Sequence, residues 1–202
     1  MDLLIATRNK KKYLEIKQLL KNSGFKVISL GLFPDLPEVK ETGKSFKENA
    51  SIKARQVSRL TGKLTLGEDS GLCVNALKGK PGIYSSRFAG LHKSDNDNNK
   101  KLLDSLEGKP ISKRKAYYVC ALSLAYKGKV LKTFEGRCRG LIGLEEKGSS
   151  GFGYDPLFII PAYKKTFAQL GLKVKHKMSH RANALKKLKD YLPRLKSELK
   201  SS

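Results

Sequence analysis

The most constraining feature of this sequence is a short apolar run that ends in polar residues and leads directly into a helical pattern. The run from Leu3 to Ala6 is long enough for one buried strand, and Thr7, Arg8 and Asn9 follow it. From Lys10 to Lys21, apolar side chains recur at helical spacing until a polar segment containing glycine ends the pattern. A buried strand with a helix immediately after it is typical of an α/β protein, in which polar loops after strand ends carry ligands.

The rest of the chain continues this alternation of strand and helix patterns. Ser45 and Glu48 have the spacing of a capping box, which predicts a helix from there to about Leu60. A short strand over residues 64–66 then leads into a predicted acidic turn from Gly67 to Gly71. We interpret residues 1–202 as one domain. The other predicted elements are a strand at 25–30, a helix at 95–106, a β-hairpin from strands 116–126 and 130–138, a glycine-rich loop at 148–155, a strand at 157–160 and a basic helix after Ser179.

Charge and length restrict the classes of function. The chain has 202 residues, of which 39% are hydrophobic, so it has enough apolar material for a core. Its formal net charge of +24 fits either a nucleic-acid-binding module or a protein that binds a small anion such as a triphosphate. Lysine outnumbers arginine 33 to 9, and the lysines are spread along the whole chain. That distribution favours a solvated basic surface and the small anionic ligand.

The cysteines and the apolar segments predict a cytosolic protein. Cys73, Cys120 and Cys138 are odd in number, far apart and outside any C-x-x-C pattern, so they indicate reduced thiols and not a disulfide framework or a zinc site. The apolar stretch after Met1 is shorter than the core of a signal peptide, and we expect no membrane span.

Three familiar motifs of ligand binding and catalysis are present only in incomplete form. Gly43, Lys44 and Ser45 look like the end of a phosphate-binding P-loop, but Glu38 stands where that motif requires a glycine. A dinucleotide fingerprint that starts at Gly151 fails at Pro156. Neither Ser70 nor Ser150 has both flanking glycines of a nucleophile elbow, so serine hydrolase chemistry is not supported.

Groups suited to phosphate chemistry are nevertheless present. Thr7, Asn9 and Lys12 lie where a strand meets a helix, and backbone amides at a helix start can bind phosphate together with a lysine. Acidic residues outside predicted helices provide carboxylates for Mg²⁺, which takes one or two carboxylates together with substrate phosphates. These residues are Glu41, Glu68 and Asp69, and three further hydrogen-bond donors lie together at Lys175, His180 and Arg181.

Taken together, these segments resemble the inosine triphosphate pyrophosphatase family, the dITP/XTP pyrophosphatases that remove deaminated purine nucleotides. The resemblance covers about residues 3–190. It rests on ATRNKKKYLE (6–15), ETGKSFKENASIKA (41–54), EDSGLCVNAL (68–77), GKPGIYSSRFAG (79–90), GFGYDPLF (151–158) and SHRANAL (179–185). It implies an elongated mixed sheet flanked by helices, with two lobes around a central substrate cleft, and a homodimer.

The resemblance also implies a reaction and roles for individual residues. Water would attack the α-phosphorus of ITP, dITP or XTP, leaving the nucleoside monophosphate and pyrophosphate. Asp69 is then the catalytic residue, as a base or as a metal ligand, and Glu41 is its partner at Mg²⁺. The implied phosphate-binding residues are Thr7, Arg8, Asn9, Lys10, Lys11, Lys12, Lys53 and Ser70, and the implied base pocket is Phe152, Gly153, Tyr154, Asp155, Lys175, His180 and Arg181.

Substrate choice follows from hydrogen bonding. Donors aimed at a 6-oxo group of the purine lose their partner when the substrate carries a 6-amino group, at a cost of about 1–3 kcal/mol for each lost bond. ATP is therefore expected to be a poor substrate. Gln169 stands where the family commonly has an acidic residue. The alternatives are a nucleic-acid-binding module and a Maf-like nucleotide pyrophosphatase with another base preference.

Overall fold

A computed structural model describes the backbone of residues 1–200 and the side chains up to Leu195. The chain divides into two compact units, and each has its own hydrophobic core. The first unit comprises residues 1–69, 120–136 and 181 onward, and the second comprises residues 70–119 and 137–180. The helices are α1 (Lys10–Leu19), α2 (Phe46–Thr61), α3 (Asp95–Ser105), α4 (Phe167–Met178) and α5 (His180–Lys200).

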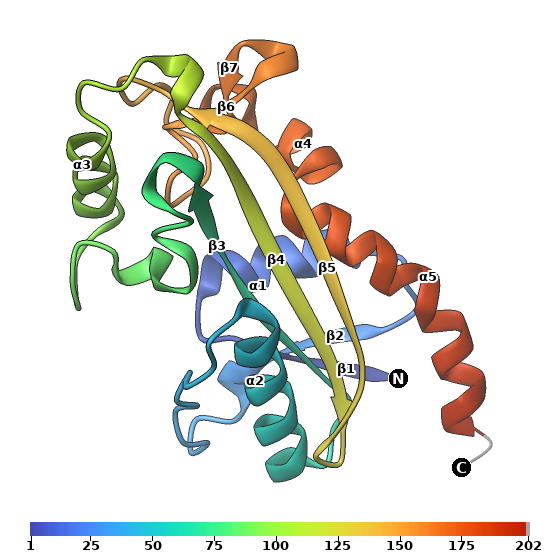
Figure 1. The fold of residues 1–202 in the computed structure, drawn as a ribbon. Helices are drawn as coiled ribbons and strands as arrows, with labels where there is room; N and C mark the ends of the chain where they lie inside the picture. The colour runs from blue at the N-terminus through green and yellow to red at the C-terminus, as the bar shows by residue number, and fades with distance from the viewer. Residues whose placement is uncertain (201–202) are drawn as a thin grey trace. The chain divides into compact units, whose positions relative to one another are not determined.

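Seven strands form a mixed sheet, as the resemblance implied (Figure 1). β1 pairs in parallel with β2 on one side and with β3 on the other, whereas β6 is antiparallel to both β5 and β7. The strand order is β2-β1-β3-β4-β5-β6-β7. The strands are β1 (Asp2–Ala6), β2 (Lys26–Ser29), β3 (Thr65–Val74), β4 (Lys115–Tyr126), β5 (Lys129–Ile142), β6 (Phe158–Ile160) and β7 (Lys165–Thr166).

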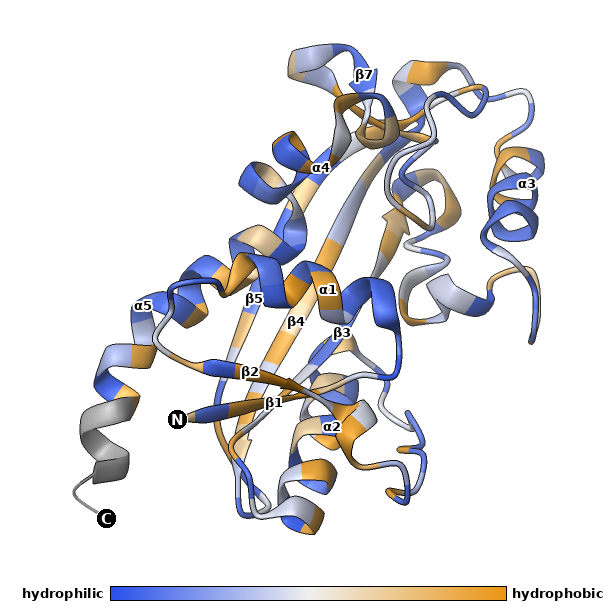
Figure 2. Ribbon diagram, turned by 180° about the vertical axis from the view of Figure 1, so that it is seen from behind, coloured by the Kyte–Doolittle hydropathy of each residue, from blue (hydrophilic) through white to orange (hydrophobic). Residues whose placement is uncertain are grey.

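In the first unit, alternation along β1 gives the sheet two apolar faces. Leu3 and Ile5 belong to a core cluster with residues of α1 and α5, while Leu4 and Ala6 belong to a second cluster with Val57 of α2. Successive side chains of a strand point to opposite faces, so this segregation is the direct result of the sequence period. Accordingly, α1 and α5 cover one face and α2 covers the other, as the two opposite views show (Figures 1 and 2).

In the second unit, the core forms around α3, α4 and the adjoining parts of β3, β4 and β6. Helix α4 was not predicted, because Gly171 interrupts it with φ 75° and ψ 173° and breaks the helical pattern. Gln169 completes a capping box with Thr166, each side chain accepting a hydrogen bond from the other residue's backbone amide. The amide oxygen of Gln169 thus makes the same bond that the carboxylate of a glutamate makes in other capping boxes.

The predicted acidic turn at residues 67–71 is wrong, because β3 continues as a strand from Thr65 to Val74. A Cβ added at Gly67 would lie 2.7 Å from the backbone nitrogen of Ala54, so only glycine lets β3 approach α2 this closely. The polar residues remain in the strand because ion pairs compensate their burial. The capping box of α2 is also incomplete: Ser45 accepts from the Glu48 amide, but the Glu48 carboxylate accepts from Lys44.

The remaining predicted elements are confirmed. The two long strands β4 and β5 are joined by Lys127 and Gly128, which have φ values of 47° and 79°. Positive φ at both central residues is the geometry of a tight hairpin turn. Among residues 1–200, no helix combines the length and the apolar composition needed to cross a membrane.

Candidate active site

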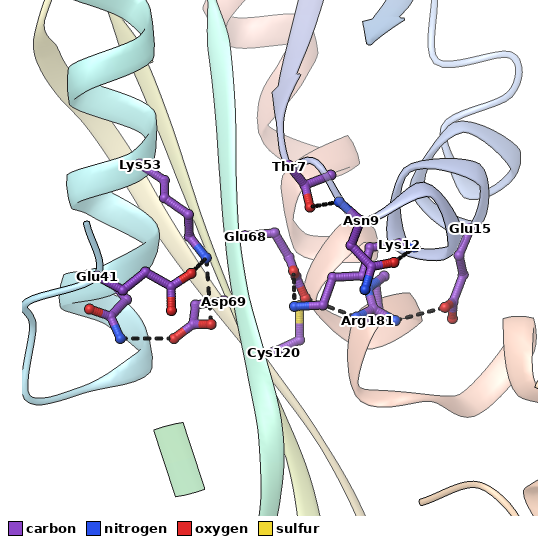
Figure 3. Close-up of polar contacts among 11 residues, drawn as sticks. Thr7, Asn9, Lys12, Glu15, Glu41, Lys53, Glu68, Asp69, Cys120 and Arg181 are labelled. Carbon is purple, nitrogen blue, oxygen red and sulfur yellow. Dashed lines mark hydrogen bonds and ion pairs between the residues drawn. The ribbon is translucent and has the colours of Figure 1, made fainter. Parts of the chain in front are cut away.

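The two neighbouring carboxylates of β3, Glu68 and Asp69, point to opposite faces of the strand (Figure 3). Both are buried, with 1% and 5% of their surfaces exposed. Because side chains alternate along a strand, adjacent acidic residues cannot share one face. The first unit therefore has two separate polar groups, one next to α2 and one next to α1 and α5.

On the face toward α2, the ammonium group of Lys53 lies between two carboxylates. Its Nζ is 2.8 Å from Oε1 of Glu41 and 3.5 Å from Oδ1 of Asp69. The Lys53 side chain is 12% exposed, so solvent still reaches it. We call Glu41, Lys53 and Asp69 the lysine bridge.

The lysine bridge changes the pKa of Lys53 and of Asp69. Burial alone would lower the pKa of Lys53, but the charges of Asp69, Glu68 and Glu41 outweigh it, so the pKa is raised. Burial raises the pKa of Asp69, and the nearby Glu41 and Glu68 add to this, although Lys53 and Lys12 oppose it. The Asp69 carboxylate is consequently a stronger base than an exposed aspartate.

Asn49 of α2 holds Asp69 from the other side. Its Nδ2 donates to Oδ2 of Asp69 at 3.2 Å, and its Oδ1 accepts the backbone N–H of Gly43 at 2.8 Å. A Cβ at Gly43 would lie 2.7 Å from Oδ1 of Asn49, so this close approach requires glycine. The buried amide thus fixes the Asp69 carboxylate and ties the segment that carries Glu41 to the start of α2.

On the opposite face, Glu68 is bound by two cations. Its Oε2 is 2.9 Å from Nζ of Lys12, and its Oε1 accepts from Nη2 of Arg181 at 2.9 Å. Arg181 also donates through Nη1 to Oε2 of Glu15 at 2.7 Å. The thiol of Cys120 contacts Glu68, and burial together with Glu68 raises the pKa of this thiol well above its usual value. We call Lys12, Glu15, Glu68 and Arg181 the arginine network. Glu68 is engaged here and does not face the lysine bridge.

The loop before α1 is ordered by its own short polar side chains. Oγ1 of Thr7 accepts the Asn9 amide at 3.2 Å, and Oδ1 of Asn9 caps the helix by accepting the Lys12 amide at 3.0 Å. Arg8 donates to the Leu36 carbonyl at 2.6 Å, which anchors the neighbouring loop. Lys10 and Lys11 are exposed. The loop therefore presents a capped helix start and several cations, which is an arrangement that attracts phosphate.

The lysine bridge offers a donor set that fits a hard divalent cation. Two carboxylates already surround one positive charge, the Lys53 ammonium, which stands in for a cation between them. Mg²⁺ prefers oxygen ligands and commonly takes one or two carboxylates, with the other positions filled by phosphate and water. In the part of the chain described, no cluster of three or more His, Cys, Asp or Glu residues has metal-binding geometry. Glu41 and Asp69 thus fit a metal that substrate oxygens help to hold.

In the second unit, a glycine-rich loop is organised around Asp155. Its Oδ2 accepts the Phe152 amide at 3.0 Å and the Lys175 ammonium at 2.6 Å, and both members of this ion pair are almost fully buried. Gly151 has φ 87°, and a Cβ there would collide with the Asp155 carboxylate. The Gly153 amide donates to Asp95 of α3 at 2.9 Å. The loop conformation therefore depends on these two carboxylates and on the glycines.

The aromatic members of this unit are placed by similar contacts. Nζ of Lys175 lies 4.4 Å from the centroid of the partly exposed Phe152 ring. Tyr154 donates to the Ser85 carbonyl at 2.8 Å, and burial raises the pKa of its hydroxyl. His180 stacks on Tyr118 with ring centroids 4.6 Å apart. Ser70, a predicted phosphate ligand, lies in β3 and is partly buried.

The structure sorts the predicted residues into groups. Glu41, Lys53 and Asp69 are in contact, whereas Arg181, predicted for the base pocket, is bound to Glu15 and Glu68 in the first unit. Sequence reasoning gave no role to Glu15 or Asn49. A signal was available for both. Glu15 lies one turn before Leu19 on the apolar face of α1, and Asn49 lies one turn before Lys53, so each places a polar group on or beside a helix's buried face.

Comparisons with known proteins identify the family of this chain. Residues 3–191 match the model of the Ham1 family. A dITP/XTP pyrophosphatase of Desulforamulus reducens is 50% identical over 195 residues, which cover 96% of this chain and 97% of that protein. A HAM1 protein of Coxiella burnetii is 36% identical with a TM-score of 0.87, over 96% of this chain and 99% of its own. The Ham1 protein of Staphylococcus aureus is 39% identical with a TM-score of 0.85, over 96% and 98% respectively. These findings confirm the resemblance drawn from the motifs, and the chain belongs to the Ham1 family.

Proposed function

We propose that this protein hydrolyses the deaminated purine nucleotides ITP, dITP and XTP to the nucleoside monophosphate and pyrophosphate. The observation that carries the proposal is the lysine bridge, in which Glu41 and Asp69 surround a positive charge within the same unit as the phosphate-attracting loop of residues 7–12. The relatives named dITP/XTP pyrophosphatases support the choice of substrate. A nucleic-acid-binding module has no need of such a carboxylate pair.

The first unit supplies the groups for phosphate chemistry. Asp69 is our catalytic residue, acting as a base toward water or as a metal ligand, and its raised pKa suits the first of these roles. Lys12, Lys53 and the amides of residues 7–12 are assigned to the triphosphate. Mg²⁺, held by Glu41 and Asp69, would neutralise charge on the phosphate oxygens.

The second unit supplies the groups for base recognition. We assign the stacking contact with the purine to Phe152, the ring of which lies beside the Lys175 ammonium. The other assigned residues are Gly153, Tyr154, Asp155, Lys175 and His180. Donors in this set would pair with a 6-oxo group and be left unpaired by a 6-amino group.

The deciding experiment is a substrate panel. The protein is incubated with ITP, dITP, XTP or ATP, with and without Mg²⁺, and released pyrophosphate is measured. We expect metal-dependent turnover of the three 6-oxo substrates, with a kcat/KM at least about tenfold above that for ATP. Equal turnover of ATP would contradict the base assignment, and release of orthophosphate in place of pyrophosphate would contradict the reaction.

Assembly and compartment belong to the same proposal. We propose a homodimer, which sedimentation equilibrium tests directly. We also propose a cytosolic location, since Cys73, Cys120 and Cys138 are all buried free thiols and a reducing compartment keeps them so.

A further inference from the structure

We propose that Lys53 is a resident counter-ion that keeps divalent metal away from Glu41 and Asp69 until the phosphates of a nucleotide draw its ammonium group aside. Metal and nucleotide would then bind together, and the nucleotide-free enzyme would bind metal weakly. The inference rests on the proposed function and deepens it, because it gives one phosphate-binding lysine a second task.

The Lys53 ammonium and a divalent metal ion would compete for the same space. The Lys53 ammonium lies 2.8 Å from an oxygen of Glu41 and 3.5 Å from an oxygen of Asp69. A Mg²⁺ ion that binds both carboxylates needs oxygens at about 2.0–2.1 Å. The ion and the ammonium would therefore occupy the same position between these oxygens. One of the two cations has to leave before the other can bind.

The Asp69 carboxylate is held in place, whereas the lysine side chain can move. Asn49 fixes Asp69 through Oδ2 and also binds the Gly43 amide, two residues after Glu41. Lys53, in contrast, has a flexible four-carbon stem, and its side chain is 12% exposed. Its ammonium can exchange carboxylate oxygens for phosphate oxygens by rotation of its own side chain, without a shift of the backbone.

Lys12 differs from Lys53 in what its departure would leave behind. Lys12 pairs with Glu68 on the other face of β3, where Arg181 binds the same carboxylate. If Lys12 moves toward a phosphate, Glu68 keeps a positive partner. If Lys53 moves, Glu41 and Asp69 lose the cation between them, and a divalent ion can take that place. Departure of Lys53, unlike that of Lys12, therefore leaves two carboxylates without the cation between them and lets a divalent metal ion bind there.

The test is a calorimetric titration of the nucleotide-free protein with Mn²⁺ alone, which measures the affinity for the metal. We expect weak binding by the wild type and an affinity higher by about tenfold or more in Lys53→Met, because a positive charge next to the ion is removed. The matched control is Lys63→Met. Lys63 is 38% exposed and pairs with Asp2, so its loss changes the net charge equally without opening the carboxylate pair.

Two further outcomes complete the test. Lys53→Arg keeps a cation in place and should bind Mn²⁺ as weakly as the wild type, which a purely structural role for Lys53 would not require. Unchanged affinity in Lys53→Met, or an equal gain in Lys63→Met, would overturn the inference. Lys53→Gln provides the neutral variant if Lys53→Met does not fold. The proposed function fails separately, if wild-type protein releases no pyrophosphate from ITP.

Discussion

Each unit of this protein contains a lysine bound to carboxylate, and the two lysines differ in burial and in the distances to their carboxylates. Lys175 pairs with Asp155 at 2.6 Å, and their side chains are 3% and 2% exposed. Lys53 has two carboxylate partners at longer distances, and Glu41, one of these partners, has a side chain that is 29% exposed. Lys175 is suited to holding a loop in one conformation, whereas Lys53 is suited to exchanging partners.

The physical basis of this difference is the cost of separating buried charges. Breaking a fully buried ion pair leaves an unsolvated charge, which is strongly unfavourable, whereas solvent can compensate a partly exposed ammonium when it moves. The loop with Phe152 therefore depends on a fixed pair, and the phosphate chemistry depends on a movable one. Four experiments test this comparison.

The largest effect is expected for Asp69→Asn. This change keeps the shape of the side chain and removes the basic oxygen, so turnover should fall by about a hundredfold to ten-thousandfold. Steady-state pyrophosphate release measures the loss, and circular dichroism checks the fold. Asp104→Asn, on the exposed face of α3, is the matched control. Nearly full activity in Asp69→Asn would remove the lysine bridge from the mechanism.

Loss of the fixed lysine should cost the most stability. Lys175→Met leaves Asp155 buried and without its ammonium, and we expect a loss of about 3–5 kcal/mol in the free energy of unfolding. Lys53→Met should cost only about 1–2 kcal/mol, because its surroundings are partly solvated. Urea denaturation measures both changes, with exposed Lys173→Met as the control. Similar losses in the two variants would mean that the pairs do not differ as described.

Base preference should depend on the second unit. His180→Gln changes the donor geometry beside Tyr118, and we expect the ratio of kcat/KM for ITP over ATP to fall by about tenfold. The comparison variant is His92→Gln, at an exposed loop position. A lower affinity for inorganic pyrophosphate with an unchanged ratio would instead assign His180 to the phosphates.

The smallest effect concerns pH and stability. The pKa of Asp69 lies above its usual value of 3.8. When the pH is lowered, activity should therefore begin to fall at a higher pH than it would with an ordinary aspartate. The native state then binds this proton more tightly than the unfolded state does. Ionisation of Asp69 therefore costs stability as the pH rises through the raised pKa, and the cost is complete above it. At neutral pH, Asp69→Asn should be more stable by about 1 kcal/mol, which thermal unfolding measures.

Much of the fold was predictable because its elements follow simple periods. The continuous apolar run of Leu3, Leu4 and Ile5 predicts a buried strand, and the helical spacing on α1 and α5 predicts which helix faces are buried. The strand character of residues 67–71 could not be predicted in this way. Two carboxylates and a glycine favour a turn locally, and only the packing of Gly67 on α2 and the ion pairs from distant helices reverse that preference.

The candidate site was predictable to a similar degree. The motifs predicted Glu41, Lys53 and Asp69 as site residues, and in the structure the three side chains are in contact. The sequence places Glu15 and Asn49 on or beside a buried helix face, but it does not predict their partners, which lie in segments far away along the chain. Arg181 illustrates the same limit: its position in a motif says nothing about the two carboxylates that bind it.

The opposite orientation of Glu68 and Asp69 has a consequence for protein engineering. One peptide unit of β3 separates the residue that pairs with Lys12 and Arg181 from the residue that pairs with Lys53. A single residue inserted just before Glu68 would reverse these assignments, since a shift of one position turns every side chain of a strand to the other face. The length of this strand is therefore as important to both polar clusters as the identity of its two acidic residues.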